Sequence, residues 1–291
     1  MKFIRHLILV LLVLSWSVMV IGQTKSPSST FFFIQITDPQ FGFLDANKSF
    51  DKEKVLYNKA VDEMNRLNPA FVVITGDFVH NMGDSLQWDE FNRITSKINV
   101  PVFLCPGNHD IGENPTQQSI DEYRKKYGDD KFSFRYKKNR FIGLNSTVIK
   151  AGVPEFEQEQ FLWLQKELLK SGRAKNILIF THHPFFINDP DEPETGSNIG
   201  IEKRKKYLEL FVKHKVNTVF AGHLHKNAYG RYKDLDMITT SSAGKQLGVS
   251  AQQNLPGFRI ILVRNDHVSS KYYGLEEMPE LIDFDSIFGH K

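Results

Sequence analysis

Short apolar runs alternate with amphipathic stretches along this chain, and five of the runs stop abruptly on polar residues. The runs are rich in β-branched and aromatic residues, a composition that favours buried strands. The stretches between them have the apolar spacing of helices, and strands separated by helices build an α/β layered core. The polar residues that follow the five runs are Asp38, Asp77, Asn108 with its neighbours His109 and Asp110, His182 with His183, and His223 with His225.

This pattern predicts the elements of one domain that covers residues 31–291. We expect strands at residues 31–37, 70–75, 102–105, 132–136, 141–144, 176–180 and 216–220, and helices at 52–67, 84–98, 117–127, 154–169 and 203–214. Beyond residue 228 only short strands are expected, at residues 229–232, 237–241, 258–263 and 268–273. Because the chain shows no internal repeat and no change of composition, a single domain behind a polar linker at residues 23–30 is the simplest organisation.

The N-terminal segment has the features of a secretory signal peptide. Lys2 and Arg5 precede an apolar run at residues 7–21, and Gly22 supplies a small residue where such a leader is cleaved. Residues 1–22 are therefore expected to be removed near Gly22, which gives a secreted, periplasmic or cell-envelope protein. The alternative is a protein anchored to the membrane by the uncleaved leader, although the run is shorter than the roughly 20 residues of a full span.

Composition and charge argue against several classes of protein. The 291 residues are 41% hydrophobic and 24% charged, which is ordinary for a globular domain. The leader contains Lys2 and Arg5 and no acidic residue, so its removal lowers the formal net charge from +3 to +1. A near-neutral chain does not favour nucleic-acid binding, and no stable membrane span is expected once the leader is removed. Cys105 is the single cysteine of the sequence, so no internal disulfide can form.

The polar residues that follow the strands are expected to meet in one pocket. In open α/β sheets the ligand crevice lies at the carboxyl ends of the strands. Carboxylate, imidazole and amide oxygen together suit a divalent metal ion such as Zn, Fe or Mn. Pro39 is expected to hold Asp38 in extended geometry at the end of its strand. His223 and His225 are two residues apart, so in an extended segment their side chains would point the same way.

The order of these motifs resembles that of the calcineurin-like metallophosphoesterases, over about residues 31–275. The resemblance is carried by Asp38, by GD at 76–77, by GNHD at 107–110, by His182 and by GHLH at 222–225. The segments DPQFG at 38–42 and QLG at 246–248 are similar to the branch that contains a Ser/Thr phosphatase. The resemblance implies an α/β fold: a four-layer α-β-β-α sandwich of two mixed β-sheets flanked by helices, with the metal site at the C-terminal strand ends.

The resemblance also implies a role for each of these residues. Asp77 would bridge two divalent metal ions, drawn from Mn, Fe, Zn or Mg. The further ligands would be, for one ion, Asn108, His182 and His223, and for the other, Asp38 and His225. His109 would be the acid that protonates the leaving oxygen, and Asp110 would orient it. Two divalent ions would outweigh the two carboxylates and make the pocket attractive to a phosphate group.

The roles of two further residues stay open. Gln40 occupies the position where most of the family has a histidine, although the Ser/Thr phosphatase branch shares the glutamine. An amide is a weaker ligand than an imidazole, so the site of Asp38 and His225 is expected to bind its metal weakly or to prefer Mg or Mn. His183 is either a weak ligand or a neighbour of the ligands. His80 is expected to be a surface or hydrogen-bonded histidine.

The activity implied by the resemblance is that of a binuclear metal-dependent phosphoesterase. It would hydrolyse phosphate monoesters by attack of metal-bound hydroxide, as a Ser/Thr phosphoprotein phosphatase. A phosphodiesterase or nucleotidase with the same metal chemistry remains an alternative, because no residue settles the shape of the substrate. A non-catalytic binding protein is disfavoured, because His109 is present and only position 40 departs from the ligand series. The expected partner is a phosphorylated protein or small molecule.

Overall fold

The computed structural model describes residues 30–250 and 253–283. The expected signal peptide and residues 23–29 of the expected linker lie outside this part of the chain. No helix within it is both long enough and apolar enough to cross a membrane.

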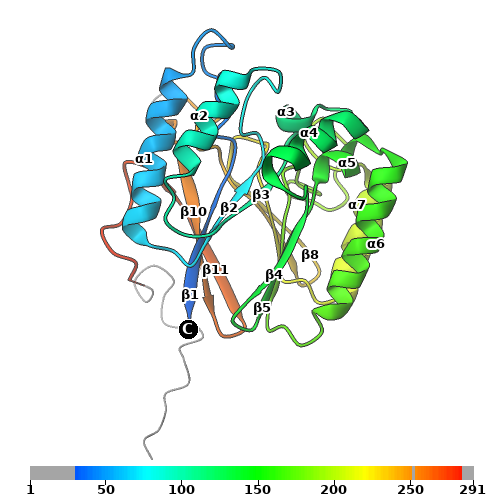
Figure 1. Cartoon of the computed structure of the whole chain (residues 1–291). Coiled ribbons are helices and arrows are strands. Elements are labelled where there is room, and N and C mark those ends of the chain that lie inside the picture. The colour runs from blue at the N-terminus through cyan, green and yellow to red at the C-terminus, as the bar shows by residue number, and fades with distance from the viewer. Residues whose placement is uncertain (1–29, 251–252, 284–291) are drawn as a thin grey trace, which may run out of the picture.

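Two β-sheets lie face to face and helices cover their outer faces, which gives the predicted four-layer sandwich (Figure 1). The first sheet has the strand order β11-β10-β1-β2-β3 and consists of β1 (Phe31–Ile36), β2 (Val72–Thr75), β3 (Val102–Cys105), β10 (Gly257–Arg264) and β11 (His267–Gly274). The second sheet has the order β4-β5-β6-β7-β9-β8 and consists of β4 (Phe132–Tyr136), β5 (Asn139–Gly143), β6 (Ile177–Phe180), β7 (Thr218–Ala221), β8 (Ala228–Tyr232) and β9 (Leu235–Thr239).

The helices divide between the two outer faces (Figure 1). The helices are α1 (Asp51–Leu67) and α2 (Ser85–Thr95) beside the first sheet, α6 (Pro154–Lys170) and α7 (Ile201–Lys213) beside the second, and α3 (Asn108–Ile111), α4 (Gln117–Tyr127) and α5 (Ser146–Ala151) near the strand ends. The sequence pattern missed α3 and α5, because helices this short show no apolar period. The predicted start of α2 was one residue early, because the Asp84 carboxylate caps the helix by accepting from the amides of Leu86 and Gln87.

Parallel pairing brings the carboxyl ends of the central strands to one edge of the sandwich. In the first sheet β1, β2 and β3 run parallel, with Ile34 opposite Val72 and Val72 opposite Val102. In the second sheet β5, β6, β7 and β9 run parallel. The loops that follow these strands therefore meet at the top of Figure 1.

Aromatic side chains fill the space between the sheets and fix their relative position. The Phe33 ring lies 4.8 Å from that of Phe71, 5.5 Å from Phe141 and 5.9 Å from Phe180, measured between ring centroids. All four side chains are buried. Burial of each ring contributes about 1.5–3 kcal/mol, and edge-to-face contacts add to this. The strand ends that carry the polar residues thus stand on a tightly packed base.

Candidate metal centre

The structure brings together side chains from the ends of five strands. Asp38 follows β1, Asp77 follows β2 and Asn108 begins α3 after β3, while His182 follows β6 and His223 follows β7. One ligand atom from each of Asp38, Asp77 and His182 lies within 4.8 Å of the others, and so do those of His182, His183 and His223. The two clusters share His182, so they belong to one centre. We call the part with Asn108, His182 and His223 its first half and the part with Asp38 and His225 its second half, and the Asp77 carboxylate adjoins both.

The backbone at the ligand residues departs from the predicted extended geometry. Asp38 has a φ of +52°, so the prediction that Pro39 keeps it extended was wrong, and Asp77 has a φ of +51°. Residues other than glycine rarely adopt φ values in this left-handed range. Residues with such strained backbone angles are found most often at functional sites. The cause is long-range hydrogen bonding: the Asp38 amide donates to the Gly76 carbonyl at 3.1 Å, and the Gln40 amide donates to that of Asp77 at 2.9 Å.

His223 and His225 lie in different halves of the centre, and the expectation of an extended segment at these two residues was wrong. The segment is a bend, with φ values of +71° at His223 and +51° at His225. His223 Nδ1 lies 3.2 Å from His182 Nε2. His225 Nε2 lies 3.4 Å from Asp38 Oδ1. The two imidazoles are therefore placed as the resemblance implies, one in each half of the centre.

Backbone carbonyls fix the tautomers of two of these imidazoles. His182 Nδ1 donates to the Thr75 carbonyl at 2.8 Å, and His225 Nδ1 donates to the Lys245 carbonyl at 2.7 Å. When neutral, each ring therefore carries its hydrogen on Nδ1 and presents the Nε2 lone pair to the centre. This arrangement, with one nitrogen held by an acceptor and the other left for a cation, is typical of metal-binding histidines.

In the first half of the centre, four nitrogen and oxygen atoms that can bind a cation lie close together. His182 Nε2 lies 3.0 Å from Asn108 Oδ1, 3.2 Å from His223 Nδ1 and 3.3 Å from Asp77 Oδ2. The Asn108 amide nitrogen donates to Glu113 at 2.7 Å, which leaves its oxygen facing His182. Two nitrogens and two oxygens that converge on one point form a donor set suited to a divalent ion.

The second half contains buried oxygen atoms that lack hydrogen-bond partners. Asp38 Oδ1 and Gln40 Oε1 are buried and accept no hydrogen bond from the described residues. The Gln40 amide nitrogen lies 3.4 Å from Asp77 Oδ2, so the side chain adjoins the carboxylate that both halves share. An unsatisfied buried acceptor is costly, and a cation bound beside such an oxygen would satisfy it. The residues present therefore fit the two divalent ions that the resemblance implies.

The charges of the centre are consistent with this fit. Burial alone would raise the pKa of Asp38, but the adjacent His225 holds that pKa below its usual value. Burial alone would lower the pKa of His182, yet the Asp77 carboxylate raises it to about 10. Without a cation, a proton on His182 therefore compensates the buried carboxylates. A metal ion would displace that proton, because it binds the neutral imidazole.

His109 stands beside the centre with one ring nitrogen held by the backbone. Its amide donates to Asp77 Oδ1 at 2.9 Å, and its Nδ1 donates to the His80 carbonyl at 2.8 Å. The His80 and His109 rings lie 4.7 Å apart and are nearly parallel, with an interplanar angle of 27°. His80 therefore adjoins the centre and is more than the surface histidine that the sequence suggested. Its Nδ1 is buried without a hydrogen-bond partner among the described residues.

Asp110 supports the ligand loops and does not contact the His109 imidazole as an orienting partner. One carboxylate oxygen accepts from the Phe78 amide at 2.8 Å, and the other accepts from the Gly107 amide at 2.7 Å. The two loops that carry Asp77 and Asn108 are thereby tied together. The expected orienting role is corrected: the His80 carbonyl holds the His109 ring, and Asp110 holds the backbone beneath it.

His183 is fully buried against the first half of the centre. Its ring lies 4.3 Å from that of His223, and its Nε2 has no hydrogen-bond partner among the described residues. The Ser146 hydroxyl accepts from the amides of His182 and His183, at 3.0 and 2.8 Å. Ser146 lies at the start of α5 and was not predicted, because only the tertiary structure brings it to these two histidines.

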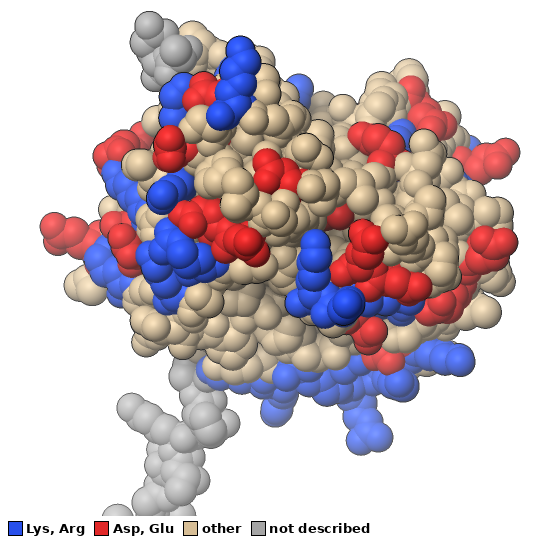
Figure 2. Space-filling view, turned by 45° about the horizontal axis from the view of Figure 1, so that its top comes forward, with Lys and Arg blue, Asp and Glu red and all other residues tan. Residues whose placement is uncertain are grey.

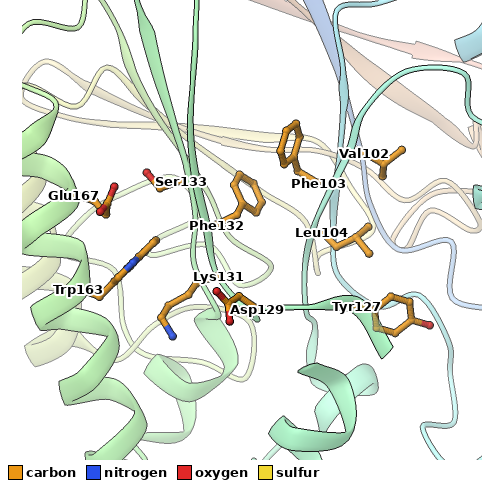
Figure 3. Close-up of a pocket in the computed structure, with 10 residues that line it drawn as sticks. All are labelled: Val102, Phe103, Leu104, Tyr127, Asp129, Lys131, Phe132, Ser133, Trp163 and Glu167. Atoms are coloured by element: carbon orange, nitrogen blue, oxygen red, sulfur yellow. The ribbon is translucent and has the colours of Figure 1, made fainter. Parts of the chain in front are cut away.

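A cavity of about 470 Å³ lies away from these residues, between β3, β4 and α6 (Figure 3). Its lining mixes aromatic side chains, among them Phe103, Phe132 and Trp163, with polar and charged ones, among them Lys131 and Glu167. None of the predicted ligands or catalytic residues lines it. The polar donor set, and not this cavity, therefore marks the place for chemistry.

The sequence profile of the calcineurin-like phosphoesterases matches residues 33–227, which contain every residue of this centre. The chain belongs to the calcineurin-like phosphoesterase family. It is 34% identical to the serine/threonine-protein phosphatase CPPED1 of Bos taurus over 271 residues, which are 86% of this chain and 85% of the relative. Calcineurin-like phosphoesterases hydrolyse phosphoesters, so the chain is a metal-dependent phosphoesterase.

Solved structures of metal-dependent phosphatases share the fold. The purple acid phosphatase PPD1 of yellow lupin superposes with a TM-score of 0.63 at 15% identity, over 87% of this chain and 52% of that chain. A dimetal phosphatase of Danio rerio superposes with a TM-score of 0.62 at 16% identity, over 85% of this chain and 97% of that chain. When two divalent ions are bound in such a centre, they hold the phosphate and supply an activated water molecule.

Proposed function

We propose that this phosphoesterase is a Ser/Thr phosphoprotein phosphatase that cleaves phosphate monoesters. The relative CPPED1 carries that activity in its name and aligns over most of both chains. The observation that carries the proposal is the position of His109: its amide donates to the shared carboxylate of Asp77, and its Nδ1 is held by the His80 carbonyl, so that Nε2 is the ring nitrogen left for a substrate among the described residues. The alkoxide that leaves a phosphate ester must be protonated, and this nitrogen is placed to supply the proton.

The residues of the chain divide the work of the reaction. Asp38, Asp77, Asn108 and the imidazoles of His182, His223 and His225 would hold the ions that attract the phosphate. The His80 carbonyl fixes hydrogen on His109 Nδ1, so the second proton of the imidazolium sits on Nε2. That proton passes to the serine or threonine oxygen as the P–O bond breaks. The proton donor His109 thus directly follows the ligand Asn108 at the start of α3.

Substrate comparison tests the proposal. A phosphoseryl peptide and p-nitrophenyl phosphate should both be hydrolysed when Mn, Mg or Zn is added, and bis(p-nitrophenyl) phosphate should be hydrolysed more slowly. Faster turnover of the diester would favour the alternative, a phosphodiesterase or nucleotidase. If no phosphoester is hydrolysed with any of the three metals, the chain acts as a binding protein and the proposal fails.

We propose as well that the chain is exported and that residues 1–22 are removed. The basic residues and apolar run at the N-terminus support this. Mass spectrometry of the native protein should find a mature N-terminus at Gln23. Recovery of the intact N-terminus in the membrane fraction would support the anchored alternative instead, and intact protein in the soluble cytoplasmic fraction would contradict both.

A further inference from the structure

The loop at residues 242–250 is fastened to the turns that carry the metal ligands. The Ser242 hydroxyl donates to the Asp38 carbonyl at 2.8 Å. Two further bonds join the loop to His225: the imidazole Nδ1 donates to the Lys245 carbonyl at 2.7 Å, and the Leu247 amide donates to the His225 carbonyl at 2.9 Å. The base of the loop is therefore held in place by the same residues that form the centre.

Two aliphatic side chains of this loop are exposed, one of them at Leu247, whose amide bonds to His225. Leu247 is 42% exposed and Val249 is 40% exposed. On the strand β1 side, the half-buried Phe43 ring lies 5.0 Å from the His225 ring and 5.3 Å from the His80 ring. Phe43, Leu247 and Val249, here called the apolar rim, thus stand on segments that contact His225.

Single exposed apolar residues are ordinary on protein surfaces and need no function. The apolar rim differs in its position, because each member belongs to a segment held against one ligand histidine. The surface around the strand ends, which faces the viewer in Figure 2, has wide uncharged areas with acidic and basic side chains mixed around them. Any group that carries a phosphate into the centre must lie against this surface, so its occupant is the substrate itself.

We propose that the apolar rim binds an apolar side chain next to the phosphorylated residue of a peptide substrate. This inference rests on the proposed protein phosphatase activity. When a phosphoserine occupies the centre, the peptide residues on either side of it lie at the margin of the site. There Leu247 and Val249 offer apolar contact. The loop bonds to Asp38 and His225 keep these side chains in place, so the contact costs little conformational entropy on binding.

Leu247→Ser and Val249→Ser test the rim without changing a metal ligand, and Leu162→Ser is the matched control. Leu162 is 47% exposed and lies on α6, away from the strand ends. The substrates are two phosphoseryl peptides that differ only in a flanking Leu or Ser, together with p-nitrophenyl phosphate. Metal content of each variant is measured alongside kcat and KM.

The wild type should prefer the Leu-flanked peptide, and each rim substitution should lower its kcat/KM by roughly tenfold, mainly through KM. Rates with the Ser-flanked peptide and with p-nitrophenyl phosphate should stay unchanged, as should metal content and the behaviour of Leu162→Ser. Equal losses on all substrates, or no loss on the Leu-flanked peptide, would overturn the inference. If the wild type cleaves p-nitrophenyl phosphate but neither peptide, the proposed protein phosphatase activity fails first.

Discussion

His109 Nδ1 lies 2.8 Å from the His80 carbonyl oxygen, so a backbone group and not a carboxylate orients the imidazole beside the metal centre. That carbonyl is itself fixed from α2. The buried Gln87 side chain accepts from the amides of His80 and Asn81, at 3.1 and 2.9 Å, and donates to Asn47 at 2.9 Å. Gln87 therefore acts on the proton donor through the backbone of residue 80.

Gln87→Met should lower kcat about tenfold or more while KM and metal content stay near their wild-type values, because the carbonyl that orients His109 loses its support. Loss of the acceptor for the partly buried amides of His80 and Asn81 should also lower the free energy of unfolding by about 1 kcal/mol. Gln118→Met, at an exposed position on α4, is the control and should change neither quantity. A stable Gln87→Met with wild-type kcat would show that the support is dispensable.

Gly222→Ala should abolish activity through Asp38. A Cβ at Gly222 would lie 1.9 Å from Thr37 Oγ1 and 2.7 Å from Asp38 Oδ2, so the carboxylate would have to move. Gly196→Ala is the control, because a Cβ there meets nothing within 4 Å. Metal titration should show weakened binding for the first variant and unchanged binding for the second. Equal affinity in both would mean that Asp38 does not hold a metal.

Gln40→His should strengthen metal binding in the half of the centre formed by Asp38 and His225. The Gln40 oxygen is buried and unpaired, and an imidazole at this position would be a better ligand for Zn or Mn. Calorimetric titration of the wild type should resolve a tight and a weak event, and the variant should tighten the weak one. Two equally tight events in the wild type, with no change in the variant, would make Gln40 a bystander.

The metal-free protein should lose stability as the pH rises above neutral. Asp77 raises the pKa of His182 to about 10, whereas the ordinary pKa of histidine is 6.5. The protonated imidazole therefore stabilises the fold fully at pH values below 6.5. This contribution is lost progressively as the pH rises from 6.5 toward 10. Melting temperatures in EDTA should therefore fall more steeply over this range for the wild type than for Asp77→Asn. Parallel curves would contradict the coupling, and added metal should flatten the wild-type curve.

The residues of the centre could be predicted because each stands directly after a buried strand. Asp38, Asp77 and His182 are placed by parallel pairing, so the sequence order of strands already implied their convergence. The alternation of apolar runs also predicted an α/β layered core with its main strands and helices, while the division of the strands into two sheets was implied only by the family resemblance. The observed ends of the helices differ from the predicted ends where a capping residue sets the boundary, as Asp84 does for α2.

The residues that hold the ligands could not be predicted in the same way. Ser146 and Gln87 lie on helices and accept hydrogen bonds from the amides of His182 and His80. The apolar pattern of a helix indicates which face is buried, but it does not indicate such contacts. The positive φ of Asp38 opposes the local preference before proline, and it arises from a bond to Gly76 in another loop. Such contacts form only when the two sheets have packed together, so no local sequence pattern predicts them.

Metal content and turnover of one purified sample test most directly the claim that Asp77 joins two ions in a phosphoesterase centre. We expect two divalent ions per chain and hydrolysis of p-nitrophenyl phosphate that EDTA abolishes and added Mn, Mg or Zn restores. Asp77→Asn should lose both metal binding and turnover, because its carboxylate adjoins both halves of the centre. Full turnover in metal-free protein, or in Asp77→Asn, would contradict the account.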